Sequence, residues 1–414
     1  MSTVTTPGRV PLYSLFGANA ISMTGNSMAQ VAIPWFVLLT TGSAAKTGLT
    51  AAMNFLPVVL ANFFGGAFVD RLGPRRASIV ADVASALPVA AIPLLHTIGG
   101  IEFWQLLILV FLGALLDAPG RTARAALLPD AVHEAAWRME RATGAFAVVD
   151  RSSRLIGAPL AGLGIAIIGA ANVLWVDAAS FLLSATLIAI GRHPSRAEGE
   201  PRERVGYLHE IRQGFRFVRK DRVIATMIFT ATITNLFDAA DGVLIPVFAK
   251  RVYGNALSLG WILGAVSAGA ALGALTYSIV GHRYSRRVVF GLGFILFSLW
   301  HLFFATFPPL WLAVVIVGLS GFGAGPINPV IDTIAYERIP REMRGRVLGV
   351  MMATAWLAMP LGSLVGGLAV AALGLRTTLL IIGICYLTTT VLVTFAPGMR
   401  EMEPGPRGRI EDSI

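Results

Sequence analysis

Two carboxylates, Asp238 and Asp241, lie within a long apolar stretch at residues 223–249. With Thr230 and Thr234 they follow spacings of four, four and three residues, which places all four side chains on one face of a helix. Carboxylates this close repel each other when both are ionised, which favours one of them keeping its proton. The pair could therefore bind and release a proton. The alternative is that both lie in a wet vestibule near the outer end of the helix and have no specific role.

Two further apolar stretches carry a second set of charges. Counted from the outer ends at 1.5 Å per residue, Asp117 and Arg154 lie roughly 21–22 Å deep, and Arg121 and Asp150 roughly 27–28 Å deep. We therefore predict two ion pairs between helices, Asp117–Arg154 and Arg121–Asp150. Asp150 and Arg154 could instead pair within one helix, because they are four residues apart. Such pairs would form either a static clamp or a switch that exchanges partners when a proton or substrate enters.

Three other aspartates lie in apolar stretches, and we expect them to have structural roles rather than roles in transport. Asp82 is expected near the inner boundary of its helix, with Arg121 or Arg124 as its partner. Asp177 and Asp332 are expected to be boundary residues, at the outer and inner ends of their helices.

The segments that hold these charges are predicted to cross a membrane. The chain of 414 residues is 55% hydrophobic and only 14% charged, which is too apolar for a soluble enzyme of this size. A charge inside a membrane span costs about 2.5–3.5 kcal/mol, so each one is a functional hypothesis by default. Stretches long enough to cross about 30 Å of hydrocarbon recur along the chain. We predict twelve, at residues 12–40, 47–69, 77–98, 103–126, 143–169, 172–191, 223–249, 257–280, 288–307, 310–336, 346–373 and 377–396.

The second half of the chain repeats the first. The offset between matching residues falls from 212 at Pro34 and Pro246 to 205 at Gly169 and Gly374. A duplicated apolar chain is typical of transporters built from parallel repeats, with a substrate site between the halves. The predicted fold is an all-α membrane protein of two pseudo-symmetric six-helix bundles. Its parts are a first bundle, a connector, a second bundle and a tail, at residues 1–191, 192–222, 223–398 and 399–414.

The basic residues are unevenly distributed, which predicts the orientation in the membrane. The net charge is +10. The only basic residues in the predicted outer loops, those on one side of the membrane, are Lys46, Lys250, Arg251 and Arg376. Most other basic residues lie in the alternate loops, the connector and the tail, and such loops are cytoplasmic. We therefore expect a multi-pass protein of the inner (cytoplasmic) membrane with both termini in the cytoplasm.

The second part of the connector, residues 206–221, predicts an amphipathic helix. Apolar residues at helical spacing alternate with arginines, so the helix could lie on the inner membrane surface with its arginines facing anionic headgroups. The alternative is a solvated linker helix.

Several classes of function are disfavoured. The sequence has no basic soluble module with aromatic platforms for nucleic acid. Cys385 is the single cysteine, and the histidines are scattered, so we expect no disulfide framework, metal centre or cofactor. No nucleophile–base set and no nucleotide-binding loop of the ATP-driven type occurs, so an enzyme is not expected.

A loop between the second and third spans resembles the signature loop of the major facilitator superfamily. It runs Gly-Ala-Phe-Val-Asp-Arg-Leu-Gly-Pro-Arg-Arg from residue 66 to 76, and a degraded copy follows at 281–287. The resemblance implies a conformational latch that holds the two halves together when the transporter is open outward. Pro74 replaces the first basic residue of the usual run. The arginines could alternatively serve only to set topology. The implied latch residues are Gly66, Asp70, Arg71, Gly73, Arg75 and Arg76.

Within this superfamily the chain is similar to the drug-exporter branch, which includes macrolide and tetracycline pumps and siderophore exporters. The similarity lies in Arg75-Arg76-x5-Asp82, in the run from Asp117 to Pro129, and in the connector segment 210–219. The family architecture implies that the first and seventh spans face a central cavity. Asn19, Ser22, Asn26 and Gln30 form a polar stripe on the first span. The substrate-binding candidates are Asn19, Asn26, Gln30, Thr234, Asn235, Asn328 and Trp356.

The resulting prediction is a secondary transporter that exports hydrophobic or amphipathic compounds in exchange for protons. Neutral or cationic solutes are expected, because the acids in the cavity disfavour anions. The expected partners are the small-molecule substrate, protons and membrane lipid, with no nucleic acid, and the protein is expected to be a monomer. The alternative is a dedicated exporter or flippase of one endogenous metabolite or lipid. Sodium coupling and uncoupled export also stay open.

Overall fold

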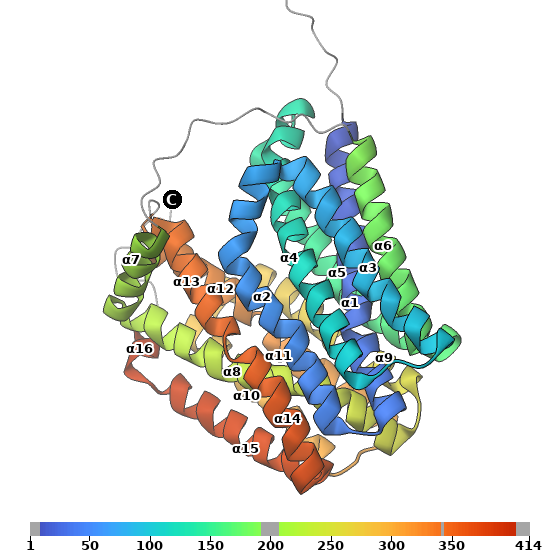
Figure 1. The fold of residues 1–414 in the computed structure, drawn as a ribbon. Helices are drawn as coiled ribbons and strands as arrows, with labels where there is room; N and C mark the ends of the chain where they lie inside the picture. Colours follow the sequence, from blue (N-terminus) through green and yellow to red (C-terminus); the bar gives the residue numbers. More distant parts are fainter. Residues whose placement is uncertain (1–8, 192–206, 341–342, 403–414) are drawn as a thin grey trace, which may run out of the picture. The chain divides into compact units, whose positions relative to one another are not determined.

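The computed structural model describes residues 9–191, 207–340 and 343–402, and it places nearly all of them in helices (Figure 1). In hydrocarbon every backbone N–H and C=O needs a partner from the chain itself, and an α-helix supplies these partners within one segment. The prediction of an all-α membrane fold is thereby confirmed. By contacts the chain divides into two compact units. The N-terminal unit is Met1–Arg202 with Gly254–Gly260, and the C-terminal unit is Glu203–Tyr253 with Trp261–Ile414.

In the described part of the N-terminal unit, long helices follow one another with short connections. Within this unit α1 packs along α5 and α6, α3 packs against α4 and α6, and α2 packs against α4. A glycine with a positive φ ends α1 and another ends α5, namely Gly42 at 67° and Gly169 at 85°. The helices are α1 (Val10–Thr41), α2 (Ala44–Leu72), α3 (Pro74–Ile98), α4 (Phe103–Glu134), α5 (Met139–Ile168) and α6 (Ala170–Ile190).

The second half begins with the connector helix α7 (Tyr207–Lys220). There α8 packs against α14, and α10 packs against α11 and α15. Two of the predicted spans are broken, one between α11 and α12 and one between α13 and α14. The elements are α8 (Arg222–Phe248), the π-helical turn η1 (Ala249–Tyr253), α9 (Ala256–Val280), the 3-10 turn η2 (Gly281–Arg283), α10 (Arg286–Phe304), α11 (Leu310–Ala324), α12 (Ile327–Arg338), α13 (Arg344–Trp356), α14 (Met359–Leu373), α15 (Leu375–Thr394) and α16 (Pro397–Arg400).

Within the described residues, nine helical stretches are long and apolar enough to cross a membrane. They coincide with nine of the predicted spans. The other three predicted spans coincide with α1, α2 and α5, which have 32, 29 and 30 residues. The total of twelve crossings stays a prediction. The nine stretches are α3, α4, α6, α9, α10, α15, Arg222–Tyr253, Leu310–Arg338 and Arg344–Leu373.

Local features recur at matching places of the two halves. Gly169 before α6 and Gly374 before α15 have nearly the same backbone angles, with φ of 85° and 81°. In the first half Arg75 donates to the carbonyl of Ala189 at 2.7 Å, near the end of α6. In the second half Arg287 donates to the carbonyl of Thr394 at 2.8 Å, at the end of α15. The repeat in the sequence therefore has matching helix ends in each half.

Two runs of small residues, at 264–273 and 362–367, bring helices of the C-terminal unit close together. A Cβ atom on Gly269 of α9 would lie 2.9 Å from the backbone nitrogen of Phe322 on α11. A Cβ atom on Gly366 of α14 would lie 2.7 Å from the Cβ atom of Ala240 on α8. Glycine at these positions permits the close backbone approach that helix pairs in lipid require.

The connector helix differs in part from its prediction. A helix forms at Tyr207–Lys220, as expected, and Arg212, Arg216 and Arg219 are exposed. However, part of its apolar face packs on protein, because Val218 joins a buried cluster with residues of α8, α12 and α13, whereas Phe215 is 48% exposed. The neighbouring residues 192–206 lie outside the described part of the chain.

Candidate functional site

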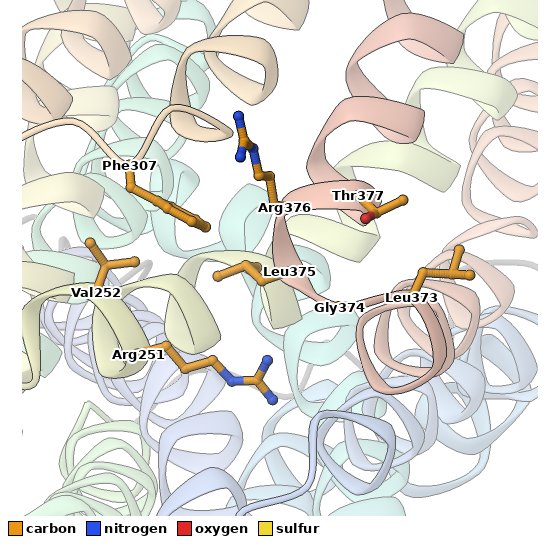
Figure 2. A pocket seen from close by; sticks show the side chains of 8 residues that line it. All are labelled: Arg251, Val252, Phe307, Leu373, Gly374, Leu375, Arg376 and Thr377. Carbon is orange, nitrogen blue, oxygen red and sulfur yellow. The ribbon is translucent and has the colours of Figure 1, made fainter.

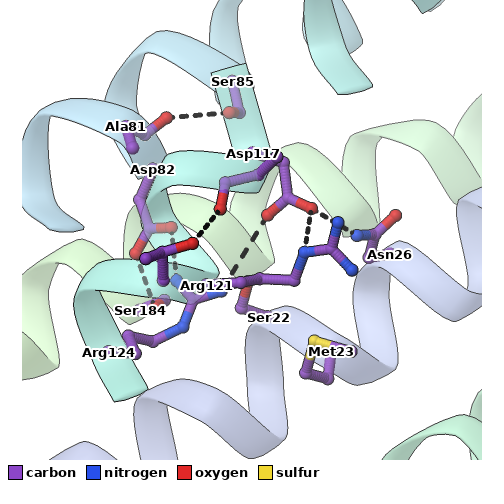
Figure 3. Close-up of polar contacts among 12 residues, drawn as sticks. Ser22, Met23, Asn26, Ala81, Asp82, Ser85, Asp117, Arg121, Arg124 and Ser184 are labelled. Carbon is purple, nitrogen blue, oxygen red and sulfur yellow. Dashed lines mark hydrogen bonds and ion pairs between the residues drawn. The ribbon is translucent and has the colours of Figure 1, made fainter. Parts of the chain in front are cut away.

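A cluster of buried charges joins α1, α3, α4 and α6 within the N-terminal unit (Figure 3). Arg124 Nη1 donates to Asp82 Oδ1 at 2.6 Å, and both side chains are fully buried. The Ser184 hydroxyl donates to the other Asp82 oxygen at 2.7 Å, and Arg124 Nη2 donates to the Ser22 hydroxyl at 3.2 Å. A buried ion pair is tolerated when such additional hydrogen bonds satisfy the remaining atoms. The prediction that Asp82 pairs with Arg121 or Arg124 is confirmed for Arg124.

Asp117 on α4 lies beside this pair and has three polar neighbours (Figure 3). Its Oδ2 accepts a hydrogen bond from Asn26 Nδ2 on α1 at 2.8 Å and lies 3.3 Å from Arg121 Nε, four residues along α4. Its Oδ1 lies 3.9 Å from Arg124 Nη2 and has no hydrogen-bond partner. The Asp117 side chain is 5% exposed, whereas that of Arg121 is 25% exposed.

The predicted pairs Asp117–Arg154 and Arg121–Asp150 are wrong. Arg154 Nε lies 3.3 Å from Asp150 Oδ2, one turn away on α5, which confirms the alternative pairing. Similar depth does not make two side chains meet, since α4 packs mainly against α2 and α3, and α5 mainly against α1. The Asp150 and Arg154 side chains are 32% and 49% exposed, in contrast to the buried cluster on α4.

Asp177 also differs from its prediction as a boundary residue. It is 1% exposed, on the face of α6 that packs against α1. Within the described residues its side chain has one hydrogen-bond neighbour, Ser180, whose hydroxyl lies 3.4 Å from Asp177 Oδ1. Space for the carboxyl exists because α1 has a glycine there: a Cβ atom on Gly25 would lie 2.7 Å from Asp177 Oδ1. Asp332 on α12 is exposed.

In the C-terminal unit, the acids on α8 are bound to residues of other helices. Asp241 Oδ1 lies 2.9 Å from His301 Nε2 on α10, and His301 is fully buried. The Tyr386 hydroxyl on α15 donates to Asp238 Oδ1 at 3.0 Å. Asp241 is 7% exposed, so the interpretation of a wet vestibule does not hold for it within this unit.

Sequence reasoning did not identify His301 and Tyr386. The sequence does contain a signal for His301, because an ionisable side chain within a membrane span is a functional candidate with a partner to be found. Tyrosine in a span gives no comparable signal, since its ring packs in apolar surroundings and only the hydroxyl needs a partner. The Tyr386 ring packs in this way, stacked on the ring of Phe237 with the two centroids 5.1 Å apart.

Asn235 satisfies backbone groups where a helix is broken. Its Nδ2 donates to the carbonyl of Ala355 at 2.9 Å, and the Thr232 hydroxyl lies 3.3 Å from the carbonyl of Thr354. These carbonyls lie at the end of α13, where the helix breaks before α14. The last carbonyls of a helix lack partners within it, and in lipid side-chain donors can satisfy them.

The other substrate candidates have varied environments. Asn19 is 3% exposed and its Nδ2 has no hydrogen-bond partner, whereas Gln30 is exposed. Thr234 is 2% exposed, and its hydroxyl donates at 3.3 Å within α8 to the carbonyl of Ala231. Asn328 is exposed at the start of α12, and Trp356 is half-buried at the end of α13.

The latch residues lie at the junction of α2 and α3. Gly66 and Asp70 lie on α2, but the surroundings of Gly66 and the side chain of Asp70 are outside the described part of the structure. Gly73 has a φ of 77°, a conformation that favours glycine. Arg75 binds the end of α6, while Arg71 and Arg76 are exposed. In the degraded copy, Arg286 forms two hydrogen bonds with Glu337, of 2.6 and 2.9 Å.

A pocket of about 470 Å³ lies in the C-terminal unit where α15 begins (Figure 2). Figure 2 shows Leu375 between Arg251 and Arg376, two of the arginines predicted for the outer loops. None of the predicted site residues lines this pocket. The lining residues are Arg251, Val252, Phe307, Leu373, Gly374, Leu375, Arg376 and Thr377.

Comparison with known proteins gives relatives over nearly the whole chain. The Multidrug efflux pump Tap of Mycolicibacterium fortuitum is 35% identical over 408 residues, covering 97% of this chain and 99% of the relative. The protein of the same name from Mycobacterium tuberculosis (strain ATCC 25618 / H37Rv) is 32% identical, covering 98% of each chain. Macrolide efflux protein A of Streptococcus pyogenes is 18% identical, covering 95% of this chain and 98% of the relative.

Solved structures share the fold, and a family model matches nearly the whole chain. A nucleoside transporter NupG mutant has a TM-score of 0.76 at 12% identity, covering 95% of this chain and 100% of its own. A bacterial homolog of the human lysosomal transporter Spinster, in an inward-facing conformation, has a TM-score of 0.70 at 13% identity, covering 97% and 100%. The model of the family described as transmembrane secretion effector matches residues 6–407. The chain therefore belongs to this family, in the drug-exporter branch of the major facilitator superfamily, and is a multi-pass membrane transporter rather than an enzyme.

Proposed function

We propose that this transporter exports hydrophobic or amphipathic compounds, neutral or cationic, in exchange for protons. The observation that carries the proposal is the 35% identity, over 97% of the chain, to a protein named as a multidrug efflux pump. At 100 mV one proton provides about 2.3 kcal/mol. This is enough for roughly fifty-fold accumulation of a solute, since about 1.4 kcal/mol corresponds to a factor of ten.

Asp238 and Asp241 are the proposed proton-coupling residues of the C-terminal unit. Their partners are a phenol and an imidazole, neither of which carries a permanent charge. Either carboxylate can therefore accept a proton without leaving an unpaired cation in the membrane. Asp82 differs, because its protonation would leave the fully buried guanidinium of Arg124 without its nearest counter-charge.

In the N-terminal unit, Asp117 and Arg121 form the proposed switch. Arg121 is partly exposed and lies one turn from Asp117, so protonation of Asp117 would free Arg121 to move. Arg124 would keep its shorter ion pair with Asp82. Asp150 and Arg154 form a second, more exposed pair, which we propose changes its contacts in the same transport cycle.

The substrate is proposed to bind along the polar stripes of α1 and α8. Asn19, Asn26 and Gln30 would contribute from α1, and Thr234 and Asn235 from α8. Asn328 and Trp356 would complete the set. Transport would proceed by alternating access, with the halves rocking about this site and the loop Gly66–Arg76 acting as the latch.

Purified protein in proteoliposomes provides the test. When a pH gradient is imposed, the wild type should accumulate cationic and neutral dyes. A protonophore should abolish the accumulation. Asp238→Asn and Asp241→Asn should each lose pH-driven accumulation but keep counterflow, in which labelled and unlabelled substrate exchange without net proton movement. Glu140→Gln is the matched control, because Glu140 has a 78% exposed side chain at the start of α5.

Three results would contradict the proposal. Full pH-driven accumulation by both asparagine variants would remove these acids from the coupling scheme. Accumulation driven by sodium and not by protons would change the coupling ion. Transport of one lipid or siderophore class without any dye would favour the dedicated exporter.

A further inference from the structure

A small cavity lies among α1, α2, α3, α4 and α6 inside the N-terminal unit. Its volume is about 30 Å³, and a single water molecule needs about 10–15 Å³. A buried water also needs two to four polar partners, and roughly three are usual. The lining supplies them from four helices: Asn26, Gln30, Asn54, Asp117 and Asp177.

One atom of a residue that lines the cavity lacks the hydrogen-bond partner that its burial requires. Asp117 is 3% exposed and lines the cavity, and its Oδ1 has no hydrogen-bond partner. Buried polar atoms nearly always have such a partner, in the protein or in ordered water. This oxygen therefore indicates a water or proton donor bound in the cavity.

Asp177 is the second carboxyl in the cavity wall, and no lysine, arginine or histidine of the described chain pairs with it. Burying an unpaired carboxylate costs far more than burying a neutral carboxylic acid. The charges of the cluster agree with this expectation. The cluster holds three carboxyls, those of Asp82, Asp117 and Asp177. It holds two guanidiniums, those of Arg121 and Arg124, and these pair with Asp82 and Asp117. One carboxyl is thus in excess.

The other charged groups around α6 do not compensate for it. α1 has no charged residue, and α3 and α5 are the other helices that pack on α6. On α3 the remaining groups are near its ends, and on α5 they are exposed or paired along the helix. These groups are Arg75, Arg76 and His96 on α3, Glu140, Arg141, Asp150, Arg151 and Arg154 on α5, Asp130, His133 and Glu134 beyond the cluster on α4, and Lys46 and Arg71 on α2.

We propose that Asp177 is a proton-binding residue of the transport cycle, and that it exchanges its proton with Asp117 through water in this cavity. The proton leaves the Asp177 hydroxyl for the water, and the water gives a proton to Asp117 Oδ1. Asp177 becomes the carboxylate, Asp117 becomes neutral, and Arg121 loses its counter-charge. This inference rests on the proposed proton coupling and adds a residue on α6 to it.

Two variants test the proposal in the intact protein. Asp177→Asn keeps the size of the side chain but cannot carry the proton. It should lower pH-driven dye accumulation at least tenfold and leave counterflow unchanged. Ala114→Val places two methyl groups at the cavity wall and changes no carboxyl, so it should displace the water and produce the same loss. Glu140→Gln again serves as the control.

Infrared spectroscopy gives a readout that a merely structural role would not change. The spectrum of the wild type at neutral pH should contain a carbonyl band of a protonated carboxyl that Asp177→Asn lacks and Ala114→Val retains. A wild type without pH-driven accumulation would contradict the proposed function, while the infrared band would still report on Asp177. An unchanged band in Asp177→Asn would overturn this inference. If Asp177→Asn failed to fold, full pH-driven accumulation by Ala114→Val would still overturn it.

Discussion

The buried charges of this transporter differ in the kind of partner they have, and this determines what each can do. Asp82 has a guanidinium at 2.6 Å and a serine hydroxyl, so both charges of its pair are satisfied. Asp238 and Asp241 have uncharged partners. A carboxylate held by a permanent cation is suited to structure, and one held by a phenol or imidazole is suited to proton exchange.

The first prediction concerns the Asp82–Arg124 pair. Asp82→Asn should destabilise the protein by about 3–5 kcal/mol, because it leaves a buried arginine without its counter-charge. Replacing both residues, as Asp82→Leu with Arg124→Met, should recover most of that loss, since a buried pair can often be exchanged for apolar side chains of similar volume. Thermal unfolding of the purified variants in detergent measures both effects. A double variant no more stable than Asp82→Asn would contradict the assignment.

The second prediction concerns Asn235. Asn235→Leu should destabilise the protein by about 1–3 kcal/mol, because the carbonyl of Ala355 then loses its donor. Asn328→Leu is the matched control, since Asn328 is exposed, and it should change the stability by no more than about 0.5 kcal/mol. Unfolding midpoints of the two variants decide the matter. Equal midpoints would show that the hydrogen bond at the helix break has no structural weight.

At the scale of elements, helix ends are held by arginines from neighbouring helices. Arg75 near the start of α3 binds the end of α6, and Arg287 near the start of α10 binds the end of α15. The last carbonyls of a helix have no partner within it and carry partial negative charge. A guanidinium supplies both the hydrogen bond and the opposite charge. One arginine of each basic pair therefore has a packing role, besides the role in topology that the charge distribution predicts.

The third prediction follows from these contacts. Arg75→Ala and Arg287→Ala should each cost about 1.5–3 kcal/mol, the range for a hydrogen bond to a charged group. Arg76→Ala should have little effect, because Arg76 is exposed. Heating the variants in detergent and following the loss of the monodisperse peak gives the comparison. If Arg76→Ala were as damaging as Arg75→Ala, the capping role would be wrong.

At the scale of the whole molecule, the two halves share helix ends but not their buried chemistry. With the offsets of the repeat, Asp117 and Asp177 correspond to Asn328 and Ile382. Conversely, Asp238 and Tyr386 correspond to Asn26 and Phe181. Each half thus has its own acids on different helices. A duplicated fold that keeps its ends and changes its interior can assign separate steps of one cycle to its two halves.

The fourth prediction concerns orientation. The distribution of arginine and lysine predicts that both termini lie in the cytoplasm. A green fluorescent protein fused after Ile414 should therefore fluoresce, and alkaline phosphatase fused there should be inactive. Fusions at Gly100, in a predicted outer loop, should give the opposite pattern. An active phosphatase at the C-terminus would reverse the topology.

The apolar segments and the helices agree closely because the sequence carries this information locally. Hydrocarbon leaves the backbone no partner but itself, so an apolar stretch of sufficient length becomes a helix whatever its neighbours are. The residues at risk of burial, such as Asp82 and Asp241, could be named for the same reason.

Their partners could not be named in the same way, since depth along a helix does not say which helices touch. Asp117 binds Asn26 on α1 and lies near Arg121 on its own helix, and no count of residues distinguishes this from a pair with Arg154. The position of His301 against Asp241, and the space that Gly25 leaves for Asp177, depend on the close approach of two helices. The sequence by itself determined the helices, their repeat and the charges within them. Only the tertiary structure decided the pairing of those charges, because rotation and packing of whole helices set which side chains meet.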